Sequence, residues 1–75
     1  MARDPFGTRL RSLRENAGMS LSRLAEEVGT DQGTLAQWER NLAVPDYATV
    51  EQLAIALGIS APGLLIGDLS RPPKR

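Results

Sequence analysis

The sequence contains no cysteine and no histidine, and its only aromatic residues are one Trp, one Tyr and one Phe. These absences exclude disulfide bonds and the Cys/His zinc sites that stabilise many small domains. They also remove the imidazole and thiol groups that many catalysts use, and no glycine-rich phosphate loop is present. We therefore expect no enzyme, no metal, no cofactor and no small-molecule ligand.

Long apolar runs are also absent. None approaches the roughly 18 residues that a membrane-spanning helix needs, and the N-terminal segment MARDPFGTRL lacks the apolar core of a signal peptide. The 75 residues suffice for one domain, which buries roughly 60% of its unfolded surface. The remaining class is a soluble, intracellular, all-α domain, with a cytoplasmic location and no membrane partner.

The nine basic and nine acidic residues cancel to a net charge of zero, but they are unevenly placed. Residues 1–16 hold four Arg and two acids, residues 17–70 hold two Arg and seven acids, and residues 71–75 hold three bases. A neutral chain has little non-specific attraction to phosphates. The bases near the two ends are expected to supply some of this attraction. They are Arg9 and Arg11 near the N-terminus and Arg71, Lys74 and Arg75 in the tail. The tail bases can equally serve only to keep the chain soluble.

The central stretch LSRLAEEVGTDQGTLAQWER, residues 21–40, predicts two short amphipathic helices. Apolar residues recur at helical spacing in both halves: Leu21, Leu24, Ala25 and Val28, then Leu35, Trp38 and Leu42. Gly29 is a typical helix end and Asp31 a typical helix N-cap. Two helices joined by about three residues with a glycine in the turn indicate a helix-turn-helix.

The flanking sequence predicts three more helices, each with an apolar stripe and end signals. The first starts near Pro5 and ends at Gly18, the fourth is capped by Asp46 and ends at Gly58, and the fifth is capped by Ser60 and ends at Gly67. Their stripes are Phe6, Leu10, Leu13 and Ala17; Tyr47, Val50, Leu53, Ala54 and Leu57; and Leu64, Leu65 and Ile66. The domain is expected at 5–67, between a flexible N-terminus, 1–4, and a basic Pro-rich tail, 68–75.

These residues resemble the Cro and phage-repressor type of helix-turn-helix, the XRE family, over residues 8–66. The resemblance is carried by LRSLRENAGMS, LAEEVG, TDQGTLAQWERN, Pro45 and LAIALGIS, in that order. It implies a compact, lambda-repressor-like bundle of five helices, whose second and third helices read DNA. It also implies that Arg14 pairs with Glu39, where spacing alone favours two solvated charges.

The resemblance implies a set of DNA-contacting residues on and around the third helix. Gln32, Gly33, Thr34 and Gln37 match base-reading positions, and Gln and Thr have the donors and acceptors for that role. The alternative for the two glutamines is a plain solvated surface. Trp38 is expected in the core, with stacking on a base as its alternative. Phosphate contacts are expected from Arg14, Asn16, Ser22, Arg40 and Asn41.

Two positions depart from the family pattern: Leu21 stands where a phosphate-contacting Gln is usual, and Gly33 offers no reading side chain. Asp31 suits the start of the helix as a cap but places a negative charge toward the phosphates. The favoured function is a sequence-specific double-stranded DNA-binding transcriptional regulator of bacterial or phage origin, with a repressor as its favoured form. The alternative is a protein-interaction module, such as an antitoxin or a transcription accessory factor.

A homodimer is expected through residues 58–70, forming in solution or fully only on DNA. The fifth helix has more apolar residues than one side of a short helix can bury. Leu65, Ile66 and Leu69 are the predicted interface residues. The alternative is that Ile66 and Leu69 fold back on the core of the same chain.

Overall fold

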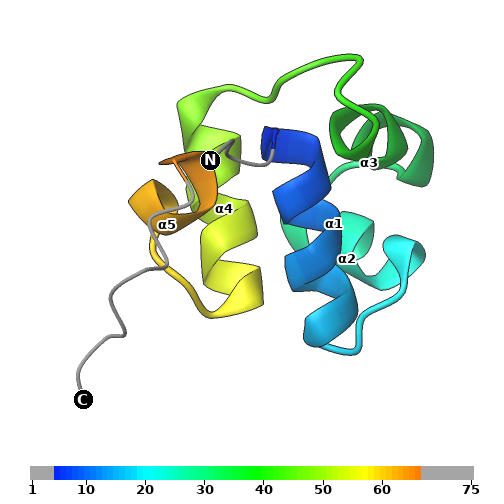
Figure 1. Cartoon of the computed structure of the whole chain (residues 1–75). Helices are drawn as coiled ribbons and strands as arrows, with labels where there is room; N and C mark the ends of the chain where they lie inside the picture. The colour runs from blue at the N-terminus through cyan, green and yellow to red at the C-terminus, as the bar shows by residue number, and fades with distance from the viewer. Residues whose placement is uncertain (1–4, 67–75) are drawn as a thin grey trace.

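The computed structural model describes residues 5–66, except for the side chain of Ile66, and this part of the chain forms five helices (Figure 1). Their order agrees with the predicted order. The helices are α1 (Phe6–Asn16), α2 (Leu21–Val28), α3 (Gln32–Glu39), α4 (Tyr47–Leu57) and α5 (Ala61–Ile66). The segments predicted as a flexible N-terminus (1–4) and a basic tail (68–75) lie outside the described residues, as does Gly67.

Four of the helices have a side chain that caps their N-terminus. Ser20, Asp31 and Asp46 accept hydrogen bonds from the backbone N–H three residues later in α2, α3 and α4. Ser60 does the same for Gly63 in α5, at 3.0 Å. Pro5 precedes α1 and provides no side-chain cap, so the first N–H groups of α1 need partners from elsewhere in the fold.

A residue in the left-handed backbone conformation follows each of the first four helices. Three of these residues are glycines, at positions 18, 29 and 58, and the fourth is Asn41, with a φ of 62°. After α3, the N–H of Leu42 donates to the carbonyl of Gln37, and that of Asn41 to Trp38. This closes the helix in a Schellman arrangement. Leu42 is therefore turned away from the helix and is 66% exposed, so its predicted place on the buried face is wrong.

The core receives one fully buried leucine from each helix: Leu10, Leu24, Leu35, Leu53 and Leu64. Trp38 packs with them and is 8% exposed, so its predicted core position is confirmed. Tyr47, the first residue of α4, is 55% exposed, and its predicted place on the apolar stripe is wrong. The stripe of α4 begins one turn later, at Val50.

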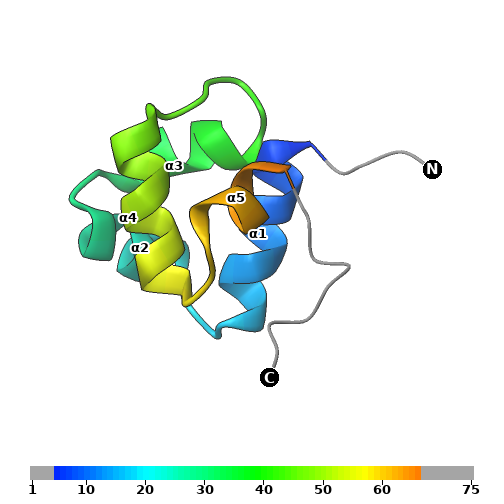
Figure 2. The ribbon, with the colours of Figure 1, turned by 90° about the vertical axis from the view of Figure 1, so that its left-hand side faces the viewer.

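The helices pack around this core with α1 between α3 and α5, and with α4 against α2 and α5. A view from the left-hand side of Figure 1 shows α5 beside α1, although they are far apart in sequence (Figure 2). No helix between residues 5 and 66 has the length and hydrophobicity needed to cross a membrane. The arrangement leaves the front of α3 uncovered.

Candidate nucleic-acid interface

The turn between α2 and α3 consists of three residues. Gly29 ends α2 with a φ of 78°. This backbone conformation is unfavourable for a residue with a side chain but not for glycine. The N–H of Thr30 donates to the carbonyl of Ala25. Asp31 then caps α3, because its carboxylate accepts the N–H of Thr34 at 2.7 Å. Because hydrogen bonds within a few residues close both ends of this turn, α3 starts at a defined position relative to α2.

The exposed front of α3 carries polar groups. Gln32, Gly33 and Gln37 are exposed and Thr34 is partly buried. The N–H of Thr34 and then its hydroxyl lower the pKa of Asp31 below its ordinary value, so the cap carries a negative charge at neutral pH. A Cβ on Gly33 would meet only the Asp31 carboxylate, at 3.6 Å. There is thus room for a side chain at this position, but glycine contributes none to the front of α3.

Arg14 and Glu39 are brought together between α1 and α3. Nε and Nη2 of Arg14 donate to the two carboxylate oxygens of Glu39, at 2.7 and 3.1 Å. Nη1 donates to the carbonyl of Met19, at 2.9 Å. The side chains are 12% and 6% exposed, and the hydrogen bond to Glu39 raises the pKa of Arg14. The back of α3 is thus held by a nearly buried, forked ion pair.

The other predicted phosphate-contacting residues lie at helix ends. Asn16 is the last residue of α1 and Ser22 the second of α2, and Arg40 and Asn41 follow α3; all four are exposed. Asn41 also has a structural contact, because its Oδ1 accepts a hydrogen bond from the N–H of Gly7 at 2.8 Å.

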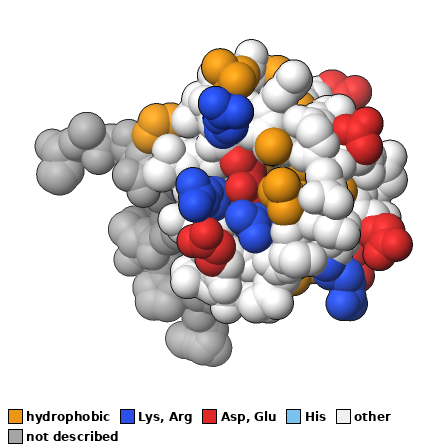
Figure 3. Space-filling view, turned by 90° about the vertical axis from the view of Figure 1, so that its right-hand side faces the viewer, with side chains coloured by type: hydrophobic (Ala, Val, Ile, Leu, Met, Phe, Trp, Pro, Cys, Tyr) orange, Lys and Arg blue, Asp and Glu red, His pale blue; other side chains and the backbone are white. Residues whose placement is uncertain are grey.

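The face on the α3 side of the molecule carries charges of both signs (Figure 3). Basic and acidic side chains stand next to one another there, with apolar side chains between them. Arg11 forms an ion pair with Glu15 on α1, and Arg23 forms one with Glu27 on α2. This face is therefore not a uniformly basic surface.

Arg9 was missed as a structural residue. It is 7% exposed, and its Nε and Nη2 donate to the carbonyls of Leu64 and Leu65, both at 2.7 Å. Its predicted role in non-specific attraction to phosphates is wrong, because its charge is turned inward against the end of α5. One signal was present: Arg9 lies at i+3 from Phe6, at the edge of the apolar stripe.

The predicted dimer residues lie at the end of the described chain. Leu65 is 36% exposed on α5. The side chain of Ile66 and the whole of Leu69 lie outside the described residues.

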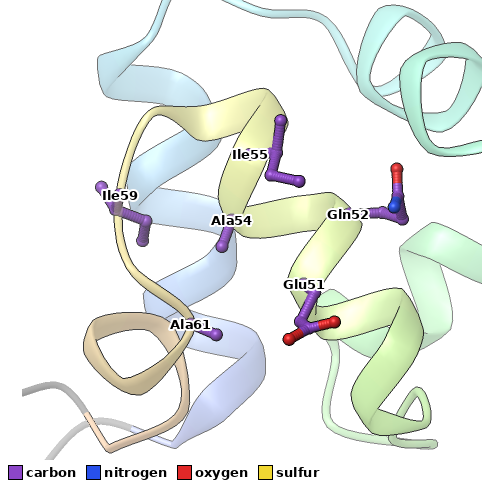
Figure 4. A pocket seen from close by; sticks show the side chains of 6 residues that line it. All are labelled: Glu51, Gln52, Ala54, Ile55, Ile59 and Ala61. Atoms are coloured by element: carbon purple, nitrogen blue, oxygen red, sulfur yellow. The ribbon is translucent and has the colours of Figure 1, made fainter.

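A pocket of about 310 Å³ opens beside α4 (Figure 4). None of its lining residues comes from α2 or α3: Glu51, Gln52, Ala54, Ile55, Ile59 and Ala61. Ile55 is 72% exposed, so the pocket is a surface hollow and not part of the candidate interface. Residues 5–66 contain no group of three or more acidic side chains placed to hold a metal ion.

The pair α2–α3, joined by a three-residue turn and with a buried back and an uncovered polar front on α3, defines a helix-turn-helix domain. The sequence model of the helix-turn-helix family HTH_3 matches residues 10–64, and the chain belongs to this family.

Several proteins of known sequence or structure are similar to the chain. The HTH-type transcriptional regulator SutR of Escherichia coli (strain K12) is 44% identical over 54 residues, which are 72% of this chain and 30% of SutR. The P22 c2 repressor, solved in complex with a synthetic operator, superposes with a TM-score of 0.83 at 30% identity, covering 88% of this chain and all of that one. SinR, a regulator of biofilm formation solved in complex with DNA, superposes with a TM-score of 0.74 at 35% identity, covering 79% of this chain and 95% of the solved SinR chain. The chain spans less than two thirds of the length of the curated relatives that it matches.

Proposed function

We propose that this chain is a sequence-specific, double-stranded DNA-binding domain of a transcriptional regulator, with repression as its mode of action. The observation that carries the proposal is the two-sided character of α3. Its back is buried through Leu35 and Trp38, while Gln32 and Gln37 are exposed on its front. A helix that is anchored on one side and polar on the other suits the major groove.

The front of α3 supplies the base readers in this proposal. A glutamine amide pairs with N6 and N7 of adenine through two hydrogen bonds, and a threonine contacts a base edge or a thymine methyl group. Gln32, Thr34 and Gln37 take these roles. Gly33 brings the helix backbone close to the bases and contributes no hydrogen-bonding side chain.

Phosphate contacts come from the surrounding helix ends. Asn16, Ser22, Arg40 and Asn41 have donors for phosphate oxygens. Arg14 uses three of its five N–H groups on Glu39 and Met19, so it still has donors for a phosphate next to its ion pair.

Two copies are proposed to bind one site. A single reading helix spans few base pairs, and regulators of this class gain specificity by placing two such helices about 34 Å apart on one face of the duplex. The partly exposed Leu65 supports an interface at the C-terminal side of the domain, with Ile66 and Leu69 as its further members. The protein would act in the cytoplasm, as a binding protein without catalytic activity.

The test is to compare three glutamine variants on two DNA duplexes. The wild-type protein first selects a preferred duplex from a random library, and the scrambled duplex serves as reference. The discrimination ratio is the dissociation constant for the scrambled duplex divided by that for the selected duplex. Gln32→Ala and Gln37→Ala should each cost about 1–3 kcal/mol on the selected duplex and little on the scrambled one.

Gln52→Ala is the matched control, because Gln52 is also an exposed glutamine but lies on α4. It should change neither constant. Equal losses on both duplexes for Gln32→Ala and Gln37→Ala would show that the glutamines do not read bases. A wild-type protein that retains no duplex at moderate salt would refute DNA binding itself.

A second candidate function is a protein-interaction module. It is favoured by three exposed apolar side chains that follow α3 closely in sequence: Leu42, Val44 and Tyr47, which are 66%, 73% and 55% exposed. The negative Asp31 at the front of α3 also weakens attraction to phosphates. Absence of DNA retention in the experiment above would favour this candidate.

A further inference from the structure

The N-terminus of α1 abuts the C-terminus of α3 with no room for a side chain. A Cβ on Gly7, the second residue of α1, would overlap the carbonyl oxygen of Trp38 and lie 2.7 Å from that of Glu39. Real Cβ atoms essentially never approach backbone oxygens so closely. The backbones of α1 and α3 are therefore in direct contact at this point, and only glycine permits it.

Asn41 completes this contact. Its Oδ1 accepts the N–H of Gly7 at 2.8 Å, while α1 has no side-chain cap of its own. The other left-handed helix ends in residues 5–66 are glycines, which have no side-chain acceptor. Asn41 thus combines two properties that its position requires: a tolerated left-handed backbone and a side-chain oxygen.

The electrostatics of the two helix ends agree with this geometry. The N-terminus of a helix carries partial positive charge and its C-terminus partial negative charge. Here the positive end of α1 faces the last carbonyls of α3. Arg14 and Glu39 join the same two helices at a second point further along α1. In addition to the buried Leu35 and Trp38, α3 is therefore held against α1 at two points.

We propose that Asn41 and Gly7 are positioning residues that set the direction of α3 and thereby the DNA discrimination of the domain. This inference rests on the proposed function. Gln32 precedes Asn41 by nine residues, about 13 Å along a helix, so a pivot of about 10° at Asn41 moves Gln32 by about 2 Å. Binding groups must be held within about 0.5 Å of their working geometry, so a shift of that size separates the glutamines from the base edges.

Two variants separate positioning from ordinary stabilisation. Asn41→Gly keeps the left-handed backbone and removes the acceptor. Ser60→Ala removes an equivalent single cap, the 3.0 Å hydrogen bond at the start of α5, which is local to α5 and outside the contact between α1 and α3. Both should lower the melting temperature slightly. Only Asn41→Gly should lower the discrimination ratio, by about tenfold, a loss comparable to that of one base contact.

A third variant separates positioning from a phosphate contact. Asn41→Asp keeps an acceptor for Gly7 and adds a negative charge. It should weaken binding to the selected and scrambled duplexes by the same factor and leave the discrimination ratio within about twofold of wild type, because charge acts on phosphates independently of sequence.

Two results would overturn the inference while leaving the proposed function intact. One is an unchanged ratio in Asn41→Gly, with equal losses on both duplexes, which would make Asn41 only a phosphate contact. The other is a collapsed ratio in Asn41→Asp. A wild-type protein that does not distinguish the two duplexes would overturn the proposed function, and this inference with it.

Discussion

Two arginines on α1, the buried Arg9 and the mostly buried Arg14, find different partners. Arg14 faces α3 and finds a carboxylate, forming a forked pair with Glu39. Arg9 faces α5 and finds the terminal backbone carbonyls of Leu64 and Leu65. One side of α1 is thus joined to α3 by a contact between two side chains. The other side is joined to α5 by a contact between the side chain of Arg9 and the backbone of α5.

A guanidinium with little exposure can thus bind a carboxylate, as Arg14 does, or donate to the carbonyls at a helix end, as Arg9 does. The last carbonyls of a helix have no partner within it and carry partial negative charge. A guanidinium with several fixed N–H donors matches either partner. The two contacts should differ in strength, because a full carboxylate loses more than a carbonyl does when its partner is removed.

The largest effect is expected from breaking the α3 side. Arg14→Ala would leave the carboxylate of Glu39, whose side chain is 6% exposed, without its guanidinium. We expect a loss of about 3–5 kcal/mol in the free energy of unfolding. Urea unfolding followed through the fluorescence of Trp38 measures it.

A double-mutant cycle with Glu39→Ala tests the pairing itself. The two losses should not add, since the second substitution removes a group that has already lost its partner. Arg23→Ala is the matched control, because its pair with Glu27 is exposed on α2, and it should cost less than about 1 kcal/mol. Additive losses for Arg14 and Glu39 would contradict the paired geometry.

A smaller effect is expected on the α5 side. Arg9→Ala removes hydrogen bonds from a charged group to two carbonyls, with an expected loss of about 1.5–3 kcal/mol. Arg9→Lys should recover only part of it, because an ammonium group is compact and lacks the planar fork. The same unfolding experiment measures both variants. A loss for Arg9→Ala as large as that for Arg14→Ala would remove the distinction between the two sides.

The smallest effect is expected from the local caps, which involve no contact between distant helices. Thr34 lowers the pKa of Asp31 through its N–H and hydroxyl, and Thr49 lowers that of Asp46 through its hydroxyl and N–H. Since both pKa values are lower in the folded than in the unfolded chain, this stabilisation is present above about pH 4 and is lost as the pH falls through the lowered values.

The matched comparison is the double variant Asp31→Asn, Asp46→Asn, because Asn caps a helix without ionising. The melting temperature of the wild type should exceed that of the variant at pH 6, and the difference should shrink toward pH 2. Titration of other carboxylates affects both proteins alike and cancels. A difference that does not change with pH would show that the charges of the caps contribute nothing.

Much of the fold was predictable because its signals are local. Asp31, Gly29 and Ser20 mark helix ends through contacts with residues a few positions away, and these ends agree with the structure. Leu42 shows the limit of periodicity: it continues the spacing of Leu35 and Trp38, but the left-handed Asn41 ends the helix before it. The roles proposed for Gln32 and Gln37 come from a resemblance, and their DNA contacts remain predictions.

The sequence by itself determined where the helices lie and which face of each is apolar, because periodicity and caps act within a few residues along the chain. Tertiary structure alone decided how the remaining backbone groups are satisfied. The N–H of Gly7 finds Asn41, and the last carbonyls of α5 find Arg9, across separations of 34 and more than 50 residues. No local pattern encodes such pairings, because backbone groups are the same at every residue and only packing determines which of them meet.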